Sequence, residues 1–216
     1  MSSRIKAELI RFANIVPAAQ SLQALRKGMI INMETNLLGK ITLKNGELLI
    51  LREPLEGDAK DMIEYLNTVG GESDNLLFGK NEFHLTVEQE MEYIKKVRND
   101  SNMHMVLGFI NNSIVSIAEI RCLSRKRISH NSEIAISVKK EYWGNGIGSA
   151  VMQELIRFAK DHKDIRNISL GVKASNLNAI RMYEKFGFIK VGVHKNYFNI
   201  NGNFDDEYIM DLNLSR

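Results

Sequence analysis

Three glycines at alternate positions, Gly144, Gly146 and Gly148, separate an apolar strand-like run from a helix-like run. Glycine leaves main-chain N–H groups free to approach an anion closely, and a helix that begins at such a loop adds the positive end of its dipole. A tight turn alone needs fewer glycines. This segment, the glycine loop (Gly144–Ser149), therefore predicts a binding site for a phosphorylated ligand.

The spacing of the glycine loop excludes two common kinds of nucleotide site. A P-loop ends in Gly-Lys-Ser or Gly-Lys-Thr, and no lysine stands at that place here. A dinucleotide fingerprint is spaced G-x-G-x-x-G, whereas this chain has G-x-G-x-G with Ser149 in place of the last glycine. That fingerprint also belongs to the first turn of an alternating fold, and several predicted strands precede this loop. The ligand is therefore another phosphorylated molecule.

A second block, Asn176–Phe188, reads N-x-x-A-I-x-x-Y-E-K-x-G-F. Together with Ile136-Ser137-Val138 and the glycine loop, it resembles the acetyl-CoA motifs of the GNAT superfamily of N-acetyltransferases. The predicted strands and helices from Ile41 to Leu212 also follow the order of that superfamily, so the resemblance implies acetyl-CoA as cosubstrate. The residues that it assigns to acetyl-CoA are Ile136, Ser137, Val138, Gly144, Asn145, Gly146, Ile147, Gly148, Ser149 and Asn176.

The resemblance also implies how these groups act. The strands ending at Val138 and Val172 splay apart, so that the pantetheine arm lies between them like an added strand. Main-chain groups from Ile136 to Val138 pair with the arm, and the Val138 amide faces the thioester oxygen. The amides of the glycine loop hold the pyrophosphate. Asn176 hydrogen-bonds the arm, although Asn there also suits a turn or a helix cap.

Acyl transfer to an amine needs a base for the amine proton and an acid for the departing thiolate. The resemblance places Tyr183 beside the sulfur, where a phenol with a pKa of ~10 can donate a proton at neutral pH. Tyr183 also fits a packed aromatic on a helix stripe. Glu133 matches an acidic position from which relatives deprotonate the amine, and it also fits a solvated strand edge. His130 is a weaker candidate base in a polar loop.

Two positions depart from the family pattern. Trp143 stands where the pattern Q/R-x-x-G-x-G/A has Gln or Arg, and we expect a modest effect because backbone amides make most of the pyrophosphate contact. Gly171 stands where relatives that acetylate ribosomal protein N-termini carry Glu, and a glycine side chain cannot accept a proton. We therefore predict transfer to a primary amine of a small molecule. The alternatives are a protein or peptide amine acetyltransferase and a non-catalytic CoA-binding regulatory domain.

Periodicity predicts an N-terminal extension over residues 1–40, with an amphipathic helix at Ile5–Ile15, and a main domain over residues 41–216. The resemblance implies that this main domain is the N-acetyltransferase domain. The domain reads as a strand pair, two helices, three strands, a helix, a strand, a short helix and a final strand pair. This order favours an α/β (α+β) fold with a mixed central sheet flanked by helices. The resemblance implies a GNAT fold, with a sheet of about seven strands that is splayed in the middle. We expect Phe78, Phe83, His84 and the Tyr197–Phe204 hairpin to form the acceptor pocket.

Turn and cap residues mark several boundaries of these elements. Hairpin turns are predicted at Asn45-Gly46, Asn111-Asn112 and Asn201-Gly202. Thr86 and a glutamine three residues later have the spacing of a capping box. Gly187 follows the short helix as a left-handed cap.

Composition sets the class of protein. The 216 residues are 44% hydrophobic, with 29 basic and 26 acidic residues and a net charge of +3, and no basic run typical of a nucleic-acid arm occurs. The single cysteine, Cys122, excludes an internal disulfide, and the histidines lack metal-ligand spacing. A signal-peptide core and an apolar run of ~20 residues are both missing. We expect a cytoplasmic protein that binds no nucleic acid, membrane or metal, with a homodimer formed through the extension as a further hypothesis.

Overall fold

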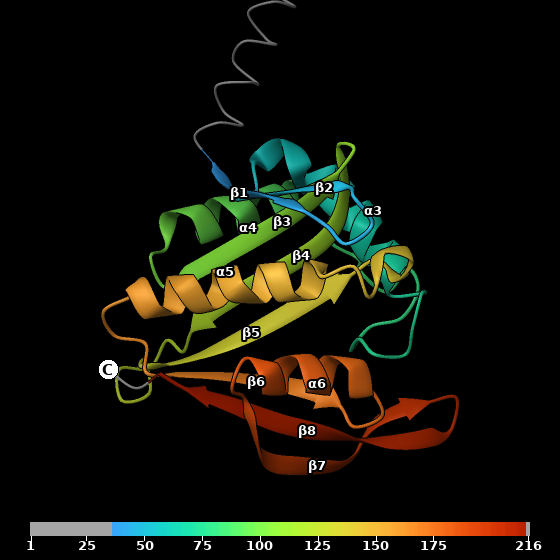
Figure 1. Ribbon diagram of the computed structural model, residues 1–216, viewed down its shortest axis with the longest axis vertical. Coiled ribbons are helices and arrows are strands. Elements are labelled where there is room, and N and C mark those ends of the chain that lie inside the picture. The colour runs from blue at the N-terminus through green and yellow to red at the C-terminus, as the bar shows by residue number, and fades with distance from the viewer. Residues whose placement is uncertain (1–35, 215–216) are drawn as a thin grey trace, which may run out of the picture. The chain divides into compact units, whose positions relative to one another are not determined.

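The computed structural model describes residues 36–214, so the predicted helix at Ile5–Ile15 lies outside the described residues. One sheet has the strand order β1-β2-β3-β4-β5-β6-β8-β7 (Figure 1). Its strands are β1 (Leu37–Thr42), β2 (Leu48–Arg52), β3 (Met103–Ile110), β4 (Ser113–Cys122), β5 (Asn131–Val138), β6 (Asn167–Lys173), β7 (Ile189–Ile200) and β8 (Asn203–Asn213). The mixed sheet is confirmed, and it has eight strands rather than about seven.

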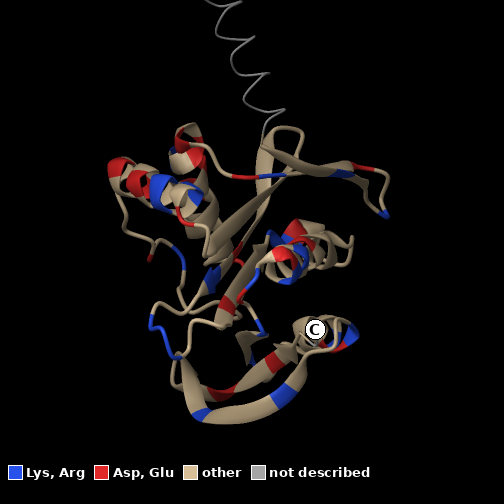
Figure 2. Ribbon diagram, turned by 90° about the vertical axis from the view of Figure 1, so that its left-hand side faces the viewer, with Lys and Arg blue, Asp and Glu red and all other residues tan. Residues whose placement is uncertain are grey.

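Four α-helices and two 3-10 turns connect these strands. They are η1 (Glu56–Asp58), α3 (Ala59–Val69), α4 (Val87–Asn99), η2 (Lys140–Tyr142), α5 (Ile147–Asp161) and α6 (Leu177–Lys185). The predicted capping box starts α4, because Thr86 Oγ1 accepts from the Gln89 N–H and Gln89 Oε1 accepts from the Thr86 N–H. None of the helices described here is long and apolar enough to cross a membrane. Figure 2 shows Lys and Arg alongside Asp and Glu on the same helices.

Two of the three predicted hairpin turns have the left-handed backbone that a two-residue turn requires. Asn111 and Asn112 have φ values of 49° and 64°, and Asn201 and Gly202 have values of 51° and 86°. Positive φ at both central residues is the signature of the type I′ turn, whose twist matches that of the strands. These turns join β3 to β4 and β7 to β8.

The first hairpin differs from the prediction in both its boundaries and its turn. β1 begins at Leu37, within the segment predicted as extension, and ends at Thr42. The Leu43 N–H donates to the Glu47 carbonyl at 2.8 Å, which leaves a loop of three residues. Gly46, with φ of 87°, takes the left-handed position that such a loop needs at its end.

The sheet opens between the parallel strands β5 and β6. Their register contains only the pairs Asn131 with Asn167, Ser132 with Ile168, and Glu133 with Ser169. β5 continues to Val138 and β6 to Lys173, each held on its other side by an antiparallel neighbour. The expected splay in the middle of the sheet is therefore confirmed.

Alternation along the strands divides the core into two layers. On β3, Val106 and Ile110 pack in the cluster that contains the buried residues of α5 and α6. Met105 and Leu107 of the same strand pack in the cluster that contains α3 and α4. Because successive side chains of a strand point to opposite faces, α5 and α6 cover one face and α3 and α4 cover the other. Figure 1 shows α5 lying across its face of the sheet.

Candidate active site

The glycine loop leads from β5 into α5 with an open helix N-terminus. Gly144 and Gly146 have φ values of 80° and 100°, and no atom lies within 4 Å of where a Cβ would stand at either residue. α5 begins without a capping side chain and without an acidic residue in its first turn. The first N–H groups of an α-helix have no partner within the helix, so those of Ile147, Gly148 and Ser149 suit an anion. The loop therefore fits a pyrophosphate group.

Trp143 fixes the strand end beside this loop. Its indole Nε1 donates to the Val138 carbonyl at 2.8 Å, and the Lys139 N–H donates to the Val115 carbonyl at 2.9 Å. The residue that departs from the family pattern thus holds one main-chain acceptor of β5. Its ring stays partly exposed, at 43% of its accessible surface.

The open seam lies between β5, which precedes the glycine loop in the chain, and β6, which follows α5. Beyond Glu133 and Ser169 the two strands no longer pair with each other, so Ile136 and Ser137 border the seam. An extended chain placed there can pair with strand edges in the manner of strand addition. The geometry accommodates a pantetheine arm that runs back from the glycine loop along β5.

Asn176 is the N-cap of α6. Its side-chain oxygen accepts from the Ala179 N–H at 3.3 Å, which satisfies one free donor of the first turn. The capping role that the sequence allowed is therefore present. Contact with the pantetheine arm stays a prediction for this residue.

Gly187 and Phe188 hold Tyr183 in place. The Phe188 N–H donates to the Tyr183 carbonyl and the Gly187 N–H donates to the Glu184 carbonyl, a Schellman motif that needs the left-handed φ of 92° at Gly187. The rings of Tyr183 and Phe188 then pack with centroids 5.9 Å apart. Burial raises the pKa of the Tyr183 phenol to about 12, so the hydroxyl keeps its proton at neutral pH.

Glu133 lies at the closed end of the seam, where β5 and β6 still pair. Its carboxylate is about half exposed and accepts from the Arg121 guanidinium at 3.0 Å. His130, the weaker candidate, lies in the preceding loop and its backbone carbonyl accepts from the Arg166 N–H. The structure therefore gives Glu133 a cationic partner and leaves it outside the cavity that β5 borders on the α3 and α4 face of the sheet.

A cavity of about 330 Å³, called here the acceptor cavity, lies on the α3 and α4 face of the sheet. One wall is formed by Ala135, Ile136 and Ser137 of β5, which brings the cavity to the open seam. The residues that line it from α3 and the loop before α4 are apolar: Met62, Leu66, Leu76, Phe78, Phe83 and Leu85. Phe78 and Phe83 are thus lining residues, whereas His84 and the Tyr197–Phe204 hairpin are not.

Hydrogen bonds fold the loop between α3 and α4 over this cavity. The Asn67 side chain donates to the Phe83 carbonyl and accepts from the Phe83 N–H, both at 3.1 Å. Farther along, Glu72 accepts from the Lys140 N–H at 2.7 Å and so ties the loop to η2. The Tyr65 hydroxyl donates to Ser137 Oγ at 3.1 Å and links α3 to β5. These hydrogen bonds hold α3 against β5 and hold the loop after α3 against η2, on two sides of the acceptor cavity.

Two carboxylates line the acceptor cavity, and the sequence prediction missed both. Glu119 on β4 stands opposite Ala135 in the register and accepts from the Tyr93 hydroxyl at 2.7 and 2.8 Å. Burial raises its pKa, which the Tyr93 hydrogen bond and the charge of Arg121 only partly offset. Glu90 on α4 is buried on the stripe that also carries Ile94. A charged residue inside an apolar strand or on a buried helix stripe was the available signal.

Comparison with known proteins decides the family. The model of the Acetyltransferase (GNAT) family matches residues 74–188. This chain belongs to the GNAT acetyltransferase family. A solved GNAT acetyltransferase from Streptococcus pneumoniae is similar with a TM-score of 0.74 and 31% identity, over 77% of this chain and 99% of that one. A Salmonella typhimurium structure with its cofactor acetyl-CoA shares the fold, with a TM-score of 0.68 and 15% identity over 77% and 94% of the chains.

Curated relatives within the GNAT family differ in their named acceptors. The L-amino acid N-acetyltransferase AaaT of Escherichia coli is 31% identical over 105 residues, which are 49% of this chain and 65% of the relative. The ribosomal protein bS18-alanine N-acetyltransferase of Escherichia coli is 32% identical over 80 residues, which are 37% and 53%. The chain thus matches about half to two thirds of the length of these relatives. Membership in the family therefore leaves the acceptor to be argued from the cavity.

Gly171 of this GNAT chain faces a carboxylate from the neighbouring strand. A Cβ at residue 171 would collide with the Glu207 carboxylate, which reaches over from β8. Glu207 is buried, and its Oε2 lies 2.9 Å from Nδ1 of His194 on β7. The space of a side chain at residue 171 is therefore taken by the acid of Glu207, whose histidine partner lies directly opposite it on the adjacent strand β7.

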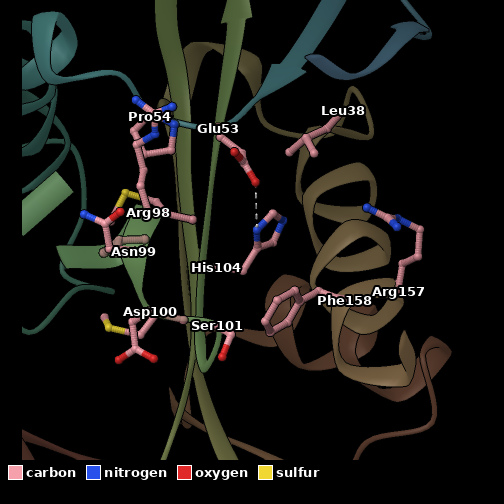
Figure 3. Close-up of a pocket in the computed structure, with 13 residues that line it drawn as sticks. Leu38, Glu53, Pro54, Arg98, Asn99, Asp100, Ser101, His104, Arg157 and Phe158 are labelled. Carbon is pink, nitrogen blue, oxygen red and sulfur yellow. Dashed lines mark ion pairs between the residues drawn. The ribbon is translucent and has the colours of Figure 1, made fainter. Parts of the chain in front are cut away.

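A second cavity of about 430 Å³ lies at the other end of α5 (Figure 3). His104 stands between Glu53 at 3.6 Å and Glu154 at 3.4 Å and stacks on the Phe158 ring. Burial favours the neutral Glu154 acid, but the close contact with His104 and the hydrogen bonds from Arg157 outweigh burial and hold the pKa of Glu154 at about 2. None of the predicted site residues lines this cavity, which is about 16 Å along the helix axis from the glycine loop.

Proposed function

We propose that this chain transfers the acetyl group of acetyl-CoA to a primary amine of a small molecule, by direct attack in a ternary complex. The observation that carries the proposal is the acceptor cavity, which ends on Ala135–Ser137 of β5, the strand that leads to the glycine loop. Its volume of about 330 Å³ is within the range of small-molecule sites. An amine seated there has access to the open seam of the sheet.

The residues of the cofactor side fit acetyl-CoA. The amides of the glycine loop would hold the pyrophosphate, and the edge of β5 at Ile136 and Ser137 would pair with the pantetheine arm. When bound, acetyl-CoA supplies an activated thioester whose carbonyl carbon is attacked by an amine. The fit rests on the uncapped start of α5 and on the open seam, both of which are built from main chain.

Two proton transfers are needed, and Tyr183 serves as the acid in one while an acidic residue serves as the base in the other. The C–N bond forms as the C–S bond breaks, Tyr183 donates a proton to the leaving sulfur, and a carboxylate takes the proton that the amine loses. Glu119 is favoured as that base over Glu133, because it lines the acceptor cavity and because burial raises the pKa of its carboxyl group. Glu133, the base predicted from sequence, is engaged by Arg121.

A thiol-release assay with acetyl-CoA tests the proposal. We expect turnover with small primary amines. Turnover with peptides alone would instead favour the protein amine alternative, which is supported by the similarity to a bS18-alanine N-acetyltransferase. Acetyl-CoA binding by calorimetry without turnover would favour a non-catalytic CoA-binding domain, and absence of binding would contradict all three functions.

A further inference from the structure

The lining of the acceptor cavity combines apolar side chains with acidic ones and contains no basic side chain. Its charged members are Glu90 and Glu119, and no Lys, Arg or His is among the residues that line it. The rest of the wall is mainly aliphatic and aromatic, with the Tyr93 and Ser137 hydroxyls as further polar groups. A ligand for this cavity therefore meets apolar contacts and negative charge.

Glu90 and Glu119 are not equivalent. The Glu119 carboxylate already accepts from the Tyr93 hydroxyl. Glu90 is only 2% exposed, and its Oε2 atom is buried without a hydrogen-bond partner among residues 36–214. A buried polar atom without a partner is costly, and buried charges in folded proteins are normally paired. The described chain therefore supplies no hydrogen-bond donor to this Oε2 atom.

We propose that Glu90 binds a second, positively charged group of the acceptor, and that the acceptor is an apolar amine without a carboxylate beside the reacting nitrogen. This inference rests on the proposed function and names its substrate class. An α-carboxylate would enter a cavity with two acidic residues and no cation, where like charges repel. A diamine with an apolar spacer places one nitrogen at β5, leaves the other for Glu90, and covers the apolar walls with its methylene groups.

Two matched pairs of acceptors test the two halves of this inference. Cadaverine and hexylamine differ by an ammonium in place of a methyl group, and leucinamide and leucine differ by an amide in place of a carboxylate. We expect kcat/KM to be at least about 10-fold higher for cadaverine than for hexylamine, and at least about 100-fold higher for leucinamide than for leucine. Equal or faster turnover of leucine would overturn the substrate class while leaving acetyl transfer intact.

The Glu90→Gln variant assigns the effect to this residue. We expect the ratio of cadaverine to hexylamine to fall to about 1 in Glu90→Gln, while Glu88→Gln, an exposed change on the same helix, keeps the wild-type ratio. A Glu90→Gln enzyme that retains the preference would overturn the role of Glu90. Thermal shift with cadaverine and hexylamine alone provides a readout that needs no turnover. If cadaverine does not stabilise the wild type more than Glu90→Gln, the inference is overturned whether or not the chain acetylates amines.

Discussion

The cofactor side of this site is formed by main-chain groups, whereas the acceptor side is formed by side chains. Main-chain groups are offered by the glycine loop, the seam between β5 and β6 and the first turn of α5. β5, the glycine loop and the start of α5 follow one another closely in the sequence, and β6 joins them by pairing with β5. The acceptor cavity is made of side chains from α3, α4, β4 and β5. A main-chain site is specified by glycines and element boundaries, whereas a side-chain cavity depends on which residues the fold brings together.

Tyr183→Phe gives the largest expected effect and tests the boundary between the two sides. The phenol hydroxyl is the proton donor for the leaving sulfur, so we expect kcat to fall by about 10² or more. The ring still packs on Phe188, so acetyl-CoA binding by calorimetry should not change. Tyr197→Phe, an exposed change on β7, is the control. Unchanged turnover would remove Tyr183 from the mechanism.

Glu119→Gln and Glu133→Gln compare a base on the acceptor cavity with one at the closed end of the seam. We expect Glu119→Gln to lower kcat/KM by about 10², because the amide cannot take the amine proton. Glu133→Gln should stay within about 3-fold of wild type, since its carboxylate pairs with Arg121 on an exposed surface. The wild-type kcat/KM should rise with pH as Glu119 loses its proton, over a range shifted upward by burial. The opposite order of the two variants would assign the base to Glu133.

Gly146→Ala perturbs the cofactor side alone. A side chain at a φ of 100° is strained and the loop must shift to relieve it, which we expect to weaken acetyl-CoA binding by about 10-fold. KM for the amine should change little, because Gly146 is not among the residues that line the acceptor cavity. Calorimetry with acetyl-CoA and steady-state kinetics measure the two effects. Equal losses on both sides would mean that the two regions do not act separately.

The smallest effect in this series is on the stability of the ligand-free protein, in the Glu90→Gln variant. Burial and the nearby charge of Glu119 raise the pKa of Glu90, while in the unfolded chain it is about 4.3. Between these values the unfolded chain has released the proton that the folded chain still holds, so wild-type stability falls as pH rises through this window.

The variant lacks this titration and the charge repulsion between Glu90 and Glu119, whereas Lys96 and Arg121, whose charges lower the pKa of Glu119, are common to both proteins. We expect equal Tm values near pH 4 and a Tm for Glu90→Gln about 2–4 °C higher at pH 7, for a difference of about 1 kcal/mol. Thermal unfolding at the two pH values measures this. A lower Tm for the variant at pH 7 would mean that Glu90 has a stabilising partner.

The same contrast explains what the sequence could predict. The glycine loop, the short helix and the strand order follow from spacing and turn chemistry, and each is present. Glu133 was chosen from its place in a linear pattern, and that pattern does not contain the pairing of β4 with β5 that brings Arg121 beside it. Glu90 and Glu119 are 29 positions apart and line one cavity only because α4 packs on the face of the sheet to which Glu119 points. Cavities of this kind follow from packing between elements, which periodicity does not determine.

Trp143 gives this molecule an optical property. It is the single tryptophan of the chain, and its indole N–H is bonded to the carbonyl at the end of β5, beside the glycine loop. Indole emission depends on the polarity around the ring and on the hydrogen bond of its nitrogen. Occupation of the neighbouring loop and seam therefore changes the emission of one fluorophore at a known place. The residue that departs from the family pattern is therefore an intrinsic fluorescence probe, with which ligand binding can be titrated in the unlabelled protein.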